Sequence, residues 1–316
     1  MLTKHLRIIF LLCLMMRFRT HFLPKKSVTL KNITSNLKHM PAAILCFFFI
    51  SNANASMLKD KIKNLEAQGW QVGVSILDYN GNKIESVNGD KRFPLDSTVK
   101  ALACANVLAK VDNKSLRLED SVLINEKDIV TYSPITEGYV NKKITLKQAC
   151  EATTAFSDNT AANIAISSVG GPSELTKFMR SIGDNTTRSD RYEPDLTINP
   201  EHDLRDTTTP NAMSNSIRKL LTGNVLSEKS KEQLKEWMIG NKVADNMLRA
   251  ELPKGWFIAD RSGASDYGIR GITSMVWSDK EPPLFISVYV RKSNTSLEER
   301  SEKIAEIGMV IFSKYH

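Results

Sequence analysis

The sequence predicts an α+β fold in which one five-stranded antiparallel sheet is assembled from both ends of the mature chain. Three observations support this prediction. Strand-like alternation of apolar and polar residues occurs near the start of the folded region and again near its end, the stretch between them has helical periodicity, and a last helix follows the final strand. The middle of the chain is therefore expected to form an all-α lobe inserted between two parts of one helix-flanked sheet.

Residues 1–55 have the composition of an export signal. They contain eight basic residues and no acidic residue, apolar stretches at residues 8–16 and 41–50, and an Ala-Asn-Ala pattern that ends at Ala55. This pattern predicts cleavage after Ala55 and a periplasmic or secreted protein. Neither stretch approaches the roughly 20 residues of a membrane-spanning helix, so no permanent membrane anchor is expected. A start of translation near residues 28–30, within a shorter signal, is the alternative.

The folded region is predicted to begin with a helix and a β-hairpin. Apolar residues recur at helical spacing over Met57–Gln68, whereas Gln71–Leu77 and Lys83–Val87 alternate as strands do. The polar stretch Asp78–Asn82 between them contains Gly81 and suits the turn of a hairpin. These two strands form the first part of the predicted sheet.

A helix that carries Ser97 is predicted next. The segment Phe93–Lys110 has Pro94 and Asp96 near its start and then Ala, Leu and Val at helical spacing. This spacing puts Ser97 in the first turn and Lys100 one turn later on the same face. An amine then lies within reach of a hydroxyl near a helix N-terminus, where a neutral lysine can act as base and developing negative charge is favoured.

The middle of the chain is predicted to be helical. Further helices are indicated over Thr145–Thr154, Asn159–Ser168, Ser173–Ser181, Pro210–Thr222 and Ser227–Gly240. Between them, Arg188–Asp206 has little periodicity, two prolines and many polar residues. A loop this long in a compact domain is usually functional or disordered.

Three strands and a helix are predicted to complete the fold. The strands are Trp256–Asp260, Gly271–Trp277 and Leu284–Val290, and the helix is Leu297–Phe312. The predicted division is a sheet-containing lobe, about residues 56–90 and 210–316, and an all-α lobe, about residues 91–209.

The composition of residues 56–316 excludes several classes of function. The whole chain carries a formal net charge of +8, which residues 1–55 supply, so the remainder is electrically balanced. Without a basic stripe or a Gly-rich phosphate loop, no nucleic-acid or nucleotide partner is expected. Of the histidines, only His202 and His316 lie outside the signal, and neither has metal-ligand spacing. A zinc site, any other cofactor and a Ser-His-Asp triad are therefore not expected.

Two cysteines, Cys104 and Cys150, remain once the signal is removed. Export to an oxidising compartment favours a disulfide between them. Closing a loop of this length would stabilise the fold by about 4 kcal/mol in the chain-entropy model. Two buried free thiols are the alternative.

Three short motifs lie at the ends of predicted elements. They are Ser97 with Lys100, Ser157-Asp158-Asn159 before a helix, and Arg261-Ser262-Gly263 after a strand. Each motif alone is weak evidence, because Ser-x-x-Lys also describes a capping serine with a surface lysine, and the Ser-Asp-Asn segment also suits an N-cap.

In this order and at these separations, the motifs resemble those of the class A β-lactamases. The resemblance extends through most of residues 56–316 and includes the segments Phe93–Lys100, Thr131–Pro134, Arg191–Leu196 and Asp206–Pro210. It implies a catalytic domain with the serine β-lactamase/DD-peptidase fold, hydrolysis of penicillins and some cephalosporins, and β-lactam resistance. Cys104 and Cys150 also fall where many members of the family have a disulfide.

The resemblance assigns catalytic roles to individual residues. Ser97 would be acylated by the lactam carbonyl, with the backbone N–H groups of Ser97 and Ala264 as the oxyanion hole. Glu193 would activate the water for deacylation, and either Glu193 or Lys100 would be the base for acylation. Ser157 would pass a proton to the departing lactam nitrogen.

The resemblance also assigns binding and positioning roles. Asn159 would hold the acylamino group of a small-molecule β-lactam, and Tyr132 would form a wall of the cleft. The long loop resembles the family's Ω loop, with Arg191 and Asp206 paired across its neck. Two surface charges worth well under 1 kcal/mol are the alternative for that pair. Nothing in the sequence requires an oligomeric partner, and a monomer is expected.

Two positions depart from the usual family pattern. Arg261-Ser262-Gly263 replaces Lys-Thr-Gly or Lys-Ser-Gly and resembles the carbenicillin-hydrolysing subgroup. A guanidinium can bind the drug's carboxylate through two N–H groups, assisted by Arg270 on the adjacent strand, which favours penicillins. Thr197 stands where most members have a water-positioning asparagine. Because threonine is shorter and lacks the amide donors, slower deacylation of some substrates is expected.

Two other functions share part of this pattern. A DD-peptidase or β-lactam sensor would keep its acyl-enzyme for long periods, whereas Glu193 in its loop favours rapid hydrolysis. A catalytically silent binding protein would retain the motifs as relics. The presence of Ser97, Lys100, Ser157 and Glu193 argues against it.

Overall fold

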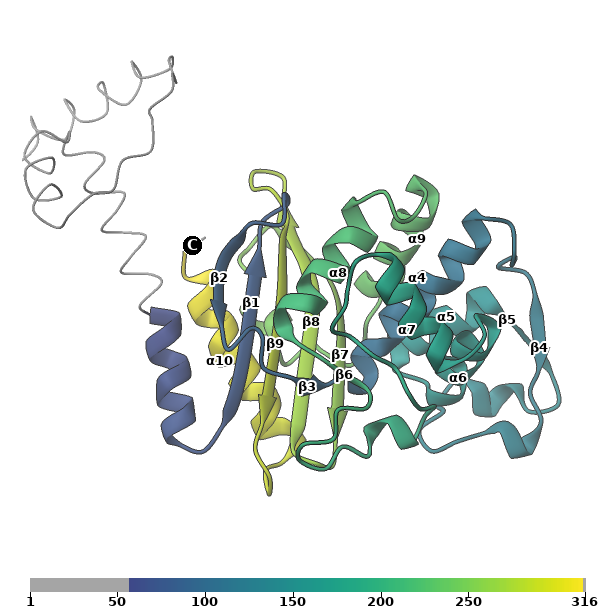
Figure 1. The fold of residues 1–316 in the computed structure, drawn as a ribbon, viewed down its shortest axis with the longest axis horizontal. Coiled ribbons are helices and arrows are strands. Elements are labelled where there is room, and N and C mark those ends of the chain that lie inside the picture. Colours follow the sequence, from purple (N-terminus) through teal and green to yellow (C-terminus); the bar gives the residue numbers. More distant parts are fainter. Residues whose placement is uncertain (1–56, 315–316) are drawn as a thin grey trace, which may run out of the picture. The chain divides into compact units, whose positions relative to one another are not determined.

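The computed structural model describes residues 57–314 of the 316-residue chain, so the predicted signal and its cleavage after Ala55 lie outside the described residues. One five-stranded antiparallel sheet in the order β2-β1-β9-β8-β7 organises the fold (Figure 1). The strands are β1 (Gln71–Leu77), β2 (Lys83–Val87), β7 (Trp256–Ser265), β8 (Ile269–Ser278) and β9 (Leu284–Arg291). Pairing of β1 with β9 joins the N-terminal hairpin to the C-terminal strands, which confirms the predicted sheet.

Side-chain alternation in β9 explains why helices cover both faces of the sheet. Leu284, Ile286 and Val288 belong to one hydrophobic core, whereas Phe285 and Tyr289 belong to the other. Successive side chains of a strand point to opposite faces, so a strand with apolar residues at both alternate sets of positions must be covered on both faces.

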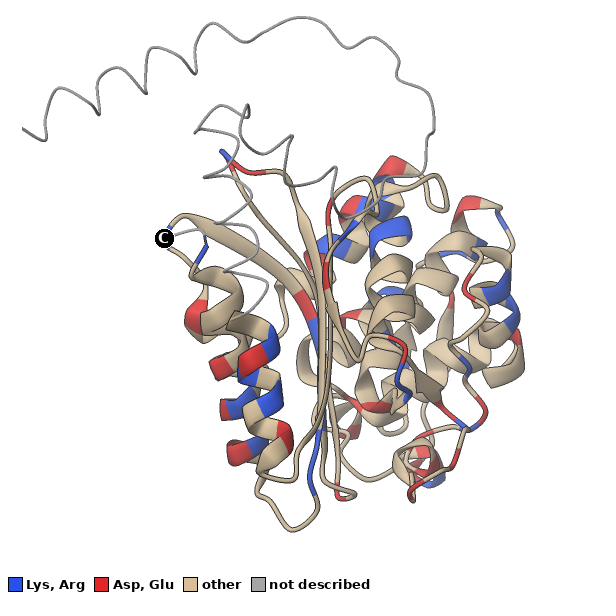
Figure 2. Ribbon diagram, turned by 60° about the vertical axis from the view of Figure 1, so that its left-hand side comes forward, with Lys and Arg blue, Asp and Glu red and all other residues tan. Residues whose placement is uncertain are grey.

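Each face of the sheet has its own helices. The first described helix (residues 57–67) and α10 (Leu297–Phe312) lie on one face, and α8 (Pro210–Thr222) packs on the other against β1, β8 and β9 (Figure 1). Acidic and basic residues are interspersed on the first pair of helices (Figure 2). Within the part of the chain that the structure describes, no helix is both long enough and apolar enough to cross a bilayer.

The helical part of the fold is built around α4, beside the β7 edge of the sheet (Figure 1). Its helices are α4 (Val99–Asp112), α5 (Leu146–Phe156), α6 (Asn159–Ser168), α7 (Pro172–Ser181) and α9 (Glu228–Ile239). Ten consecutive residues of α4 are buried, and its small side chains Ala101, Ala103 and Ala105 allow neighbouring helices to approach from several sides.

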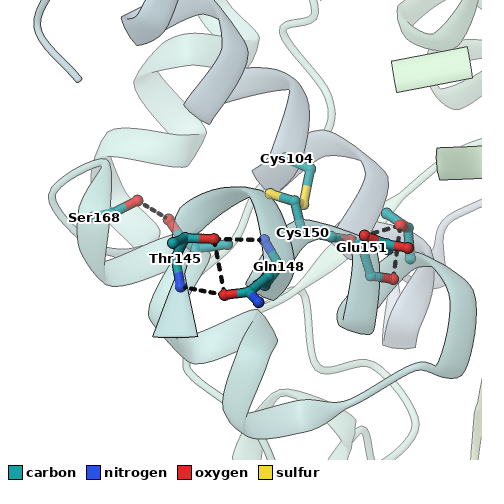
Figure 3. Close-up of a disulfide and its surroundings, with 8 residues drawn as sticks. Cys104, Thr145, Gln148, Cys150, Glu151 and Ser168 are labelled. Atoms are coloured by element: carbon teal, nitrogen blue, oxygen red, sulfur yellow. Dashed lines mark hydrogen bonds between the residues drawn. A yellow bond between two sulfur atoms is a disulfide. The ribbon is translucent and has the colours of Figure 1, made fainter. Parts of the chain in front are cut away.

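A disulfide between Cys104 on α4 and Cys150 on α5 links two of these helices, with the two Cα atoms 5.6 Å apart (Figure 3). The disulfide prediction is thus confirmed, and the alternative of two free thiols is wrong. The α5 helix begins with a reciprocal capping box between Thr145 and Gln148, which satisfies two backbone donors at its start.

The helix predicted from Phe93 begins later than expected. Phe93–Pro94 is the short strand β3, which pairs with β6 (Thr207–Thr208), and Asp96–Thr98 is a 3₁₀ turn, η2, before α4. Asp96 has a φ of +42°, outside the helical region, so a continuous helix cannot pass through it. Ser97 therefore lies in a tight turn joined to α4.

The strand predicted over Trp256–Asp260 is longer than expected. In the structure β7 continues through Arg261-Ser262-Gly263 to Ser265, so this motif lies inside the strand and not after it. The prediction stopped early because these polar residues break the apolar pattern, yet their side chains are buried against the site. A second short hairpin, β4 (Ser121–Leu123) with β5 (Lys143–Thr145), was not predicted.

Candidate active site

Ser97 lies where the η2 turn meets the edge strand β7. A Cβ atom at Gly263 would stand 2.7 Å from the backbone nitrogen of Ser97, a distance that a real side chain could not occupy. Glycine is therefore required for β7 to approach the serine this closely. Because β7 is the last strand of the sheet, alternate backbone N–H groups along it are free of strand partners.

Lys100 is fully buried and is linked to Ser97 through Ser157. Its Nζ donates to the backbone carbonyl of Ser157 at 2.8 Å, to Ser157 Oγ at 3.1 Å and to Asn159 Oδ1 at 2.5 Å. Ser157 Oγ in turn donates to Ser97 Oγ at 3.1 Å. Burial, only partly offset by the charge of Glu193, lowers the pKa of Lys100 to about 8. This amine is therefore a far stronger candidate for a base than a solvated lysine.

The Ser157-Asp158-Asn159 segment serves the fold and the site together. Ser157 ends α5 in the left-handed region with a φ of 62°, which turns its hydroxyl toward Ser97 and Lys100. Asp158 is the N-cap of α6 and accepts from the backbone N–H of Ala161 at 2.8 Å. The capping interpretation and the functional interpretation of this motif are therefore compatible.

Glu193 faces Lys100 from the long loop. Its Oε1 lies 3.1 Å from Lys100 Nζ, and both side chains are completely buried. This is a charge contact, because among the described residues neither carboxylate oxygen of Glu193 has a hydrogen-bond partner. The backbone of Glu193 is held instead by Asn163 on α6, which accepts from its N–H and donates to its carbonyl, both at 2.9 Å.

Asn163 was not singled out from the sequence, although a signal was available. It stands four residues after Asn159 on a helix whose limits were predicted as observed, so both side chains lie on one helix face. An amide at that position offers both a donor and an acceptor to a neighbouring backbone.

The neck of the long loop is closed by Arg191 and Asp206. Arg191 Nε donates to Asp206 Oδ2 at 2.6 Å, and the other carboxylate oxygen accepts from the backbone N–H groups of Asp190 and Arg191. Burial raises the pKa of Asp206 in spite of these donors. Since its side chain is only 1% exposed, the interpretation as two surface charges is wrong.

A cleft of about 360 Å³ brings all of the predicted substrate-binding residues together. Its lining includes Ser97, Tyr132, Ser157, Asn159, Thr197, Arg261, Ser262, Gly263, Ala264 and Arg270, together with Val243, Ser265, Asp266 and Leu297, which the sequence did not indicate. Lys100 and Glu193 are not part of this lining; Lys100 contacts Ser157, and Glu193 contacts Lys100. Arg191, Asp206 and the disulfide are outside the cleft.

Arg261 does not present the two-pronged donor that the sequence suggested. The residue is fully buried, and its Nε donates to the backbone carbonyl of Ser97 at 3.1 Å. Its Nη1 donates to the carbonyl of Thr154 and to Asn241 Oδ1, and its Nη2 donates to Ser157 Oγ. Four of its five N–H groups are thus used inside the protein. Only one is left for a substrate carboxylate, so the two-point contact expected from the sequence is corrected to at most one hydrogen bond.

Arg270 has more donors available toward the cleft. Its Nε donates to Ser301 Oγ at 3.1 Å and its Nη2 to the carbonyl of Val243 at 3.0 Å, which leaves Nη1 without a partner among the described residues.

Thr197 uses its hydroxyl locally, donating to the carbonyl of Pro194 at 2.8 Å.

Comparisons with known proteins agree with this geometry. The family model described as the β-lactamase enzyme family matches residues 57–315. The β-lactamase PSE-4 of Pseudomonas aeruginosa is 45% identical over 268 residues, which cover 84% of this chain and 93% of that protein.

Solved structures give the same result. The chromosome-encoded β-lactamase of Vibrio parahaemolyticus is 45% identical, with a TM-score of 0.79 over 82% of this chain and 98% of its own. An ancestral class A β-lactamase has the same TM-score at 40% identity, covering 82% of this chain and all of its own. The matches extend over both parts of the sheet and the helical middle, so the chain belongs to the β-lactamase enzyme family, as a serine hydrolase of class A.

Proposed function

We propose that Ser97 is the residue through which this enzyme hydrolyses the amide bond of β-lactams. The observation that carries the proposal is the hydrogen-bonded chain from Ser97 Oγ through Ser157 Oγ to Lys100 Nζ, with Glu193 3.1 Å from that amine. This arrangement supports proton transfer to and from the serine without a histidine or a metal ligand.

In acylation, Ser97 Oγ attacks the lactam carbonyl carbon and gives up its proton. The two candidate bases are Lys100, which has a lowered pKa and is connected to Ser97 through Ser157, and Glu193, which lies 3.1 Å from Lys100. The carbon–nitrogen bond then breaks, and the ring nitrogen receives a proton from Ser157, which recovers one from Lys100. The backbone N–H groups of Ser97 and Ala264 are proposed to bind the oxyanion, a contribution typically worth about 3 kcal/mol per donor.

In deacylation, a water attacks the ester carbonyl of the acylated Ser97. Glu193 takes a proton from that water, the ester bond breaks, and Glu193 returns the proton to the departing Ser97 Oγ, so both groups regain their starting states. Support for this role comes from the bonds of Asn163 to the backbone of Glu193 and from the closed neck of the loop. Thr197 is proposed to contribute less than an asparagine would, because its hydroxyl is used on Pro194.

Substrate recognition is proposed to rest on Asn159, Tyr132, Ser262 and Arg270. Asn159 would bind the acylamino group, and Arg270 would attract the carboxylate that β-lactams carry. Arg261 contributes positive charge at the wall of the cleft. On the Arg-Ser-Gly motif we further propose membership of the carbenicillin-hydrolysing subgroup and a preference for penicillins.

Export is also part of the proposal. Residues 1–55 would be removed as a signal, leaving residues 56–316 as one catalytic domain with its all-α lobe at about residues 91–209, against which α9 packs from the later part of the chain. The Cys104–Cys150 disulfide supports a periplasmic or secreted location, because such bonds persist in oxidising compartments. The mature protein is proposed to act as a monomer on a small-molecule substrate, without a nucleic-acid partner or a permanent membrane anchor.

One experiment tests the proposed mechanism. The mature protein is mixed with benzylpenicillin, and drug loss and intact protein mass are followed together. Many turnovers without a lasting adduct are expected, whereas Glu193→Ala should accumulate a covalent adduct on Ser97 and Ser97→Ala should form none. A persistent adduct in the unaltered protein would indicate a peptidase or sensor, and neither turnover nor adduct would indicate a silent binding protein.

A further inference from the structure

Asp96 is a buried acid that none of the proposed steps uses. It directly precedes Ser97 in the η2 turn, and its side chain is 1% exposed. Its Oδ1 has one contact, with Asn199 Nδ2 at 3.5 Å. Its Oδ2 is buried and has no hydrogen-bond partner among the described residues.

The surroundings of Asp96 connect three parts of the site. A Cβ atom at Gly263 on β7 would lie 3.0 Å from the Cβ of Asp96 and 2.7 Å from the backbone nitrogen of Ser97. Asn199, on the far side, belongs to the same loop as Glu193 and also accepts from Arg191 Nη2 at 3.3 Å. Asp96 thus lies close to the edge strand β7 through its Cβ and is joined to the loop through its Oδ1.

Titratable groups face Asp96 from four neighbouring segments of the chain. They are Glu193 from the loop, Arg270 from β8, Tyr289 and Arg291 from β9, and Arg300 from α10. The three arginines donate to other acceptors, which are Ser301 and the backbone carbonyls of Val243, Asn199, Ser265, Ile269 and Ser296. No arginine in the described structure therefore neutralises the carboxyl by a direct hydrogen bond.

We propose that Asp96 is a positioning residue that works as a neutral carboxylic acid, joining the serine turn to the loop, and that its ionisation slows deacylation at alkaline pH. An ionised Asp96 adds a second buried negative charge near Glu193. Because Asp96 directly precedes Ser97, this same charge also lies next to the proposed oxyanion hole, where it opposes the charge that develops in the reaction. This inference rests on the proposed role of Glu193 as the deacylation base.

The proton on Asp96 is expected to be retained at neutral pH. Burial, reinforced by the negative charge of Glu193, raises the pKa of Asp96 to about 8. At one pH unit above that value about nine-tenths of the carboxyls are ionised. If only the protonated enzyme deacylates at the full rate, the observed deacylation rate falls about tenfold. Lys100 loses its proton in the same range, so the two groups must be separated by substitution.

The test is the pH dependence of deacylation alone. Acyl-enzyme is formed with benzylpenicillin at neutral pH and, before it decays, is mixed in a second rapid step into buffers up to pH ~9; its decay is followed by the protein mass of samples quenched with acid. The unaltered enzyme should decay about tenfold more slowly at the alkaline end, whereas Asp96→Asn, which keeps the shape without the charge, should show almost no decline. Asp96→Ala, which loses the contact with Asn199, should decay more slowly at every pH.

A matched control and a second readout make the result decisive. Asp279→Asn removes the same charge from an exposed position on the β8–β9 turn and should keep the alkaline decline. Infrared spectra of the unaltered enzyme should contain a protonated-carboxyl band at neutral pH that disappears at alkaline pH and is absent from Asp96→Asn.

Either of two results overturns the inference. One is a flat profile in the unaltered enzyme, and the other is a decline that persists unchanged in Asp96→Asn. If Glu193→Ala accumulates no adduct, the proposed role of Glu193 as the deacylation base is wrong. That result is distinguishable from the two results that overturn the inference about Asp96.

Discussion

The two halves of the site differ in how completely the protein holds their reactive groups. On the acylation side, Ser97, Ser157 and Lys100 form a continuous hydrogen-bonded chain. On the deacylation side, Glu193 has a charge contact with Lys100 but no hydrogen bond to either carboxylate oxygen among the described residues, and Thr197 donates to its own loop. The nucleophile Ser97 is thus held by hydrogen bonds of its side chain, whereas Glu193 is held mainly by hydrogen bonds of its backbone.

This difference follows from where each group stands in the fold. Ser97 and Lys100 lie at the start of a helix packed on several sides, and Ser157 lies at the junction of two helices. Glu193 lies in a long irregular loop whose geometry depends on Asn163 and on the neck pair Arg191–Asp206. The acylation half is expected to be sensitive to side-chain chemistry, and the deacylation half to loop geometry.

The largest expected effect comes from removing the amine at the centre of the acylation half. Lys100→Met should lower the acylation rate by about 10²- to 10⁴-fold, the usual contribution of a positioned base. The effect is measured as adduct formation on Ser97 under single-turnover conditions. Lys177→Met, at an exposed lysine of α7, is the control. An unchanged acylation rate would leave Glu193 as the acylation base.

Removing the disulfide tests whether the acylation half of the site depends on this cross-link. Replacing Cys104 and Cys150 together by Ala should lower the free energy of unfolding by up to about 4 kcal/mol, because the unfolded chain regains the freedom of the open loop. The turnover number should remain within about twofold, since the hydrogen bonds of Lys100 do not involve the sulfur atoms. Urea unfolding and steady-state kinetics measure the two effects, and a parallel loss of turnover would contradict this independence.

The neck of the loop should affect deacylation more than acylation. Asp206→Asn keeps the shape but removes the charge that Arg191 binds, so Glu193 should move relative to the ester and deacylation should fall by about 10²-fold. Asp203→Asn, which removes an ion pair with Arg205 in the same loop, should have a much smaller effect. Burst kinetics with benzylpenicillin separate the two steps, and an equal loss in both would show that the neck supports the whole fold.

Much of the fold was predictable because its elements follow simple periodicity. The limits of β1, β2, α6, α8 and α10 agree with those expected from the sequence. The errors lie at the site, where Asp96 interrupts a helical pattern with a positive φ and Arg261 continues a strand with polar side chains. At both places the pattern of polar and apolar residues no longer predicts which side chains are buried. Polar side chains are buried there because they belong to the site.

The residues that gather at the site were predictable by resemblance, but their partners were not. The sequence places Ser97 near Lys100, yet the connection through Ser157 joins residues 60 positions apart. The donors of Arg261 were expected to face the substrate and are instead used on Thr154, Asn241 and the two serines. Such pairings depend on where separate elements cross, which local spacing does not specify.

The smallest expected effect is a gain on the deacylation side. Thr197→Asn should place an amide where the loop now has a hydroxyl directed at Pro194, and one added hydrogen bond of about 1 kcal/mol corresponds to roughly a fivefold faster deacylation. Thr197→Val is the matched control, because it loses the bond to Pro194 without offering a new donor. The decay of the acyl-enzyme is followed by mass for several penicillins. If Thr197→Asn leaves that decay unchanged for all of them, the water is held by other groups, and the contrast between the two halves of the site is weaker than the hydrogen bonds suggest.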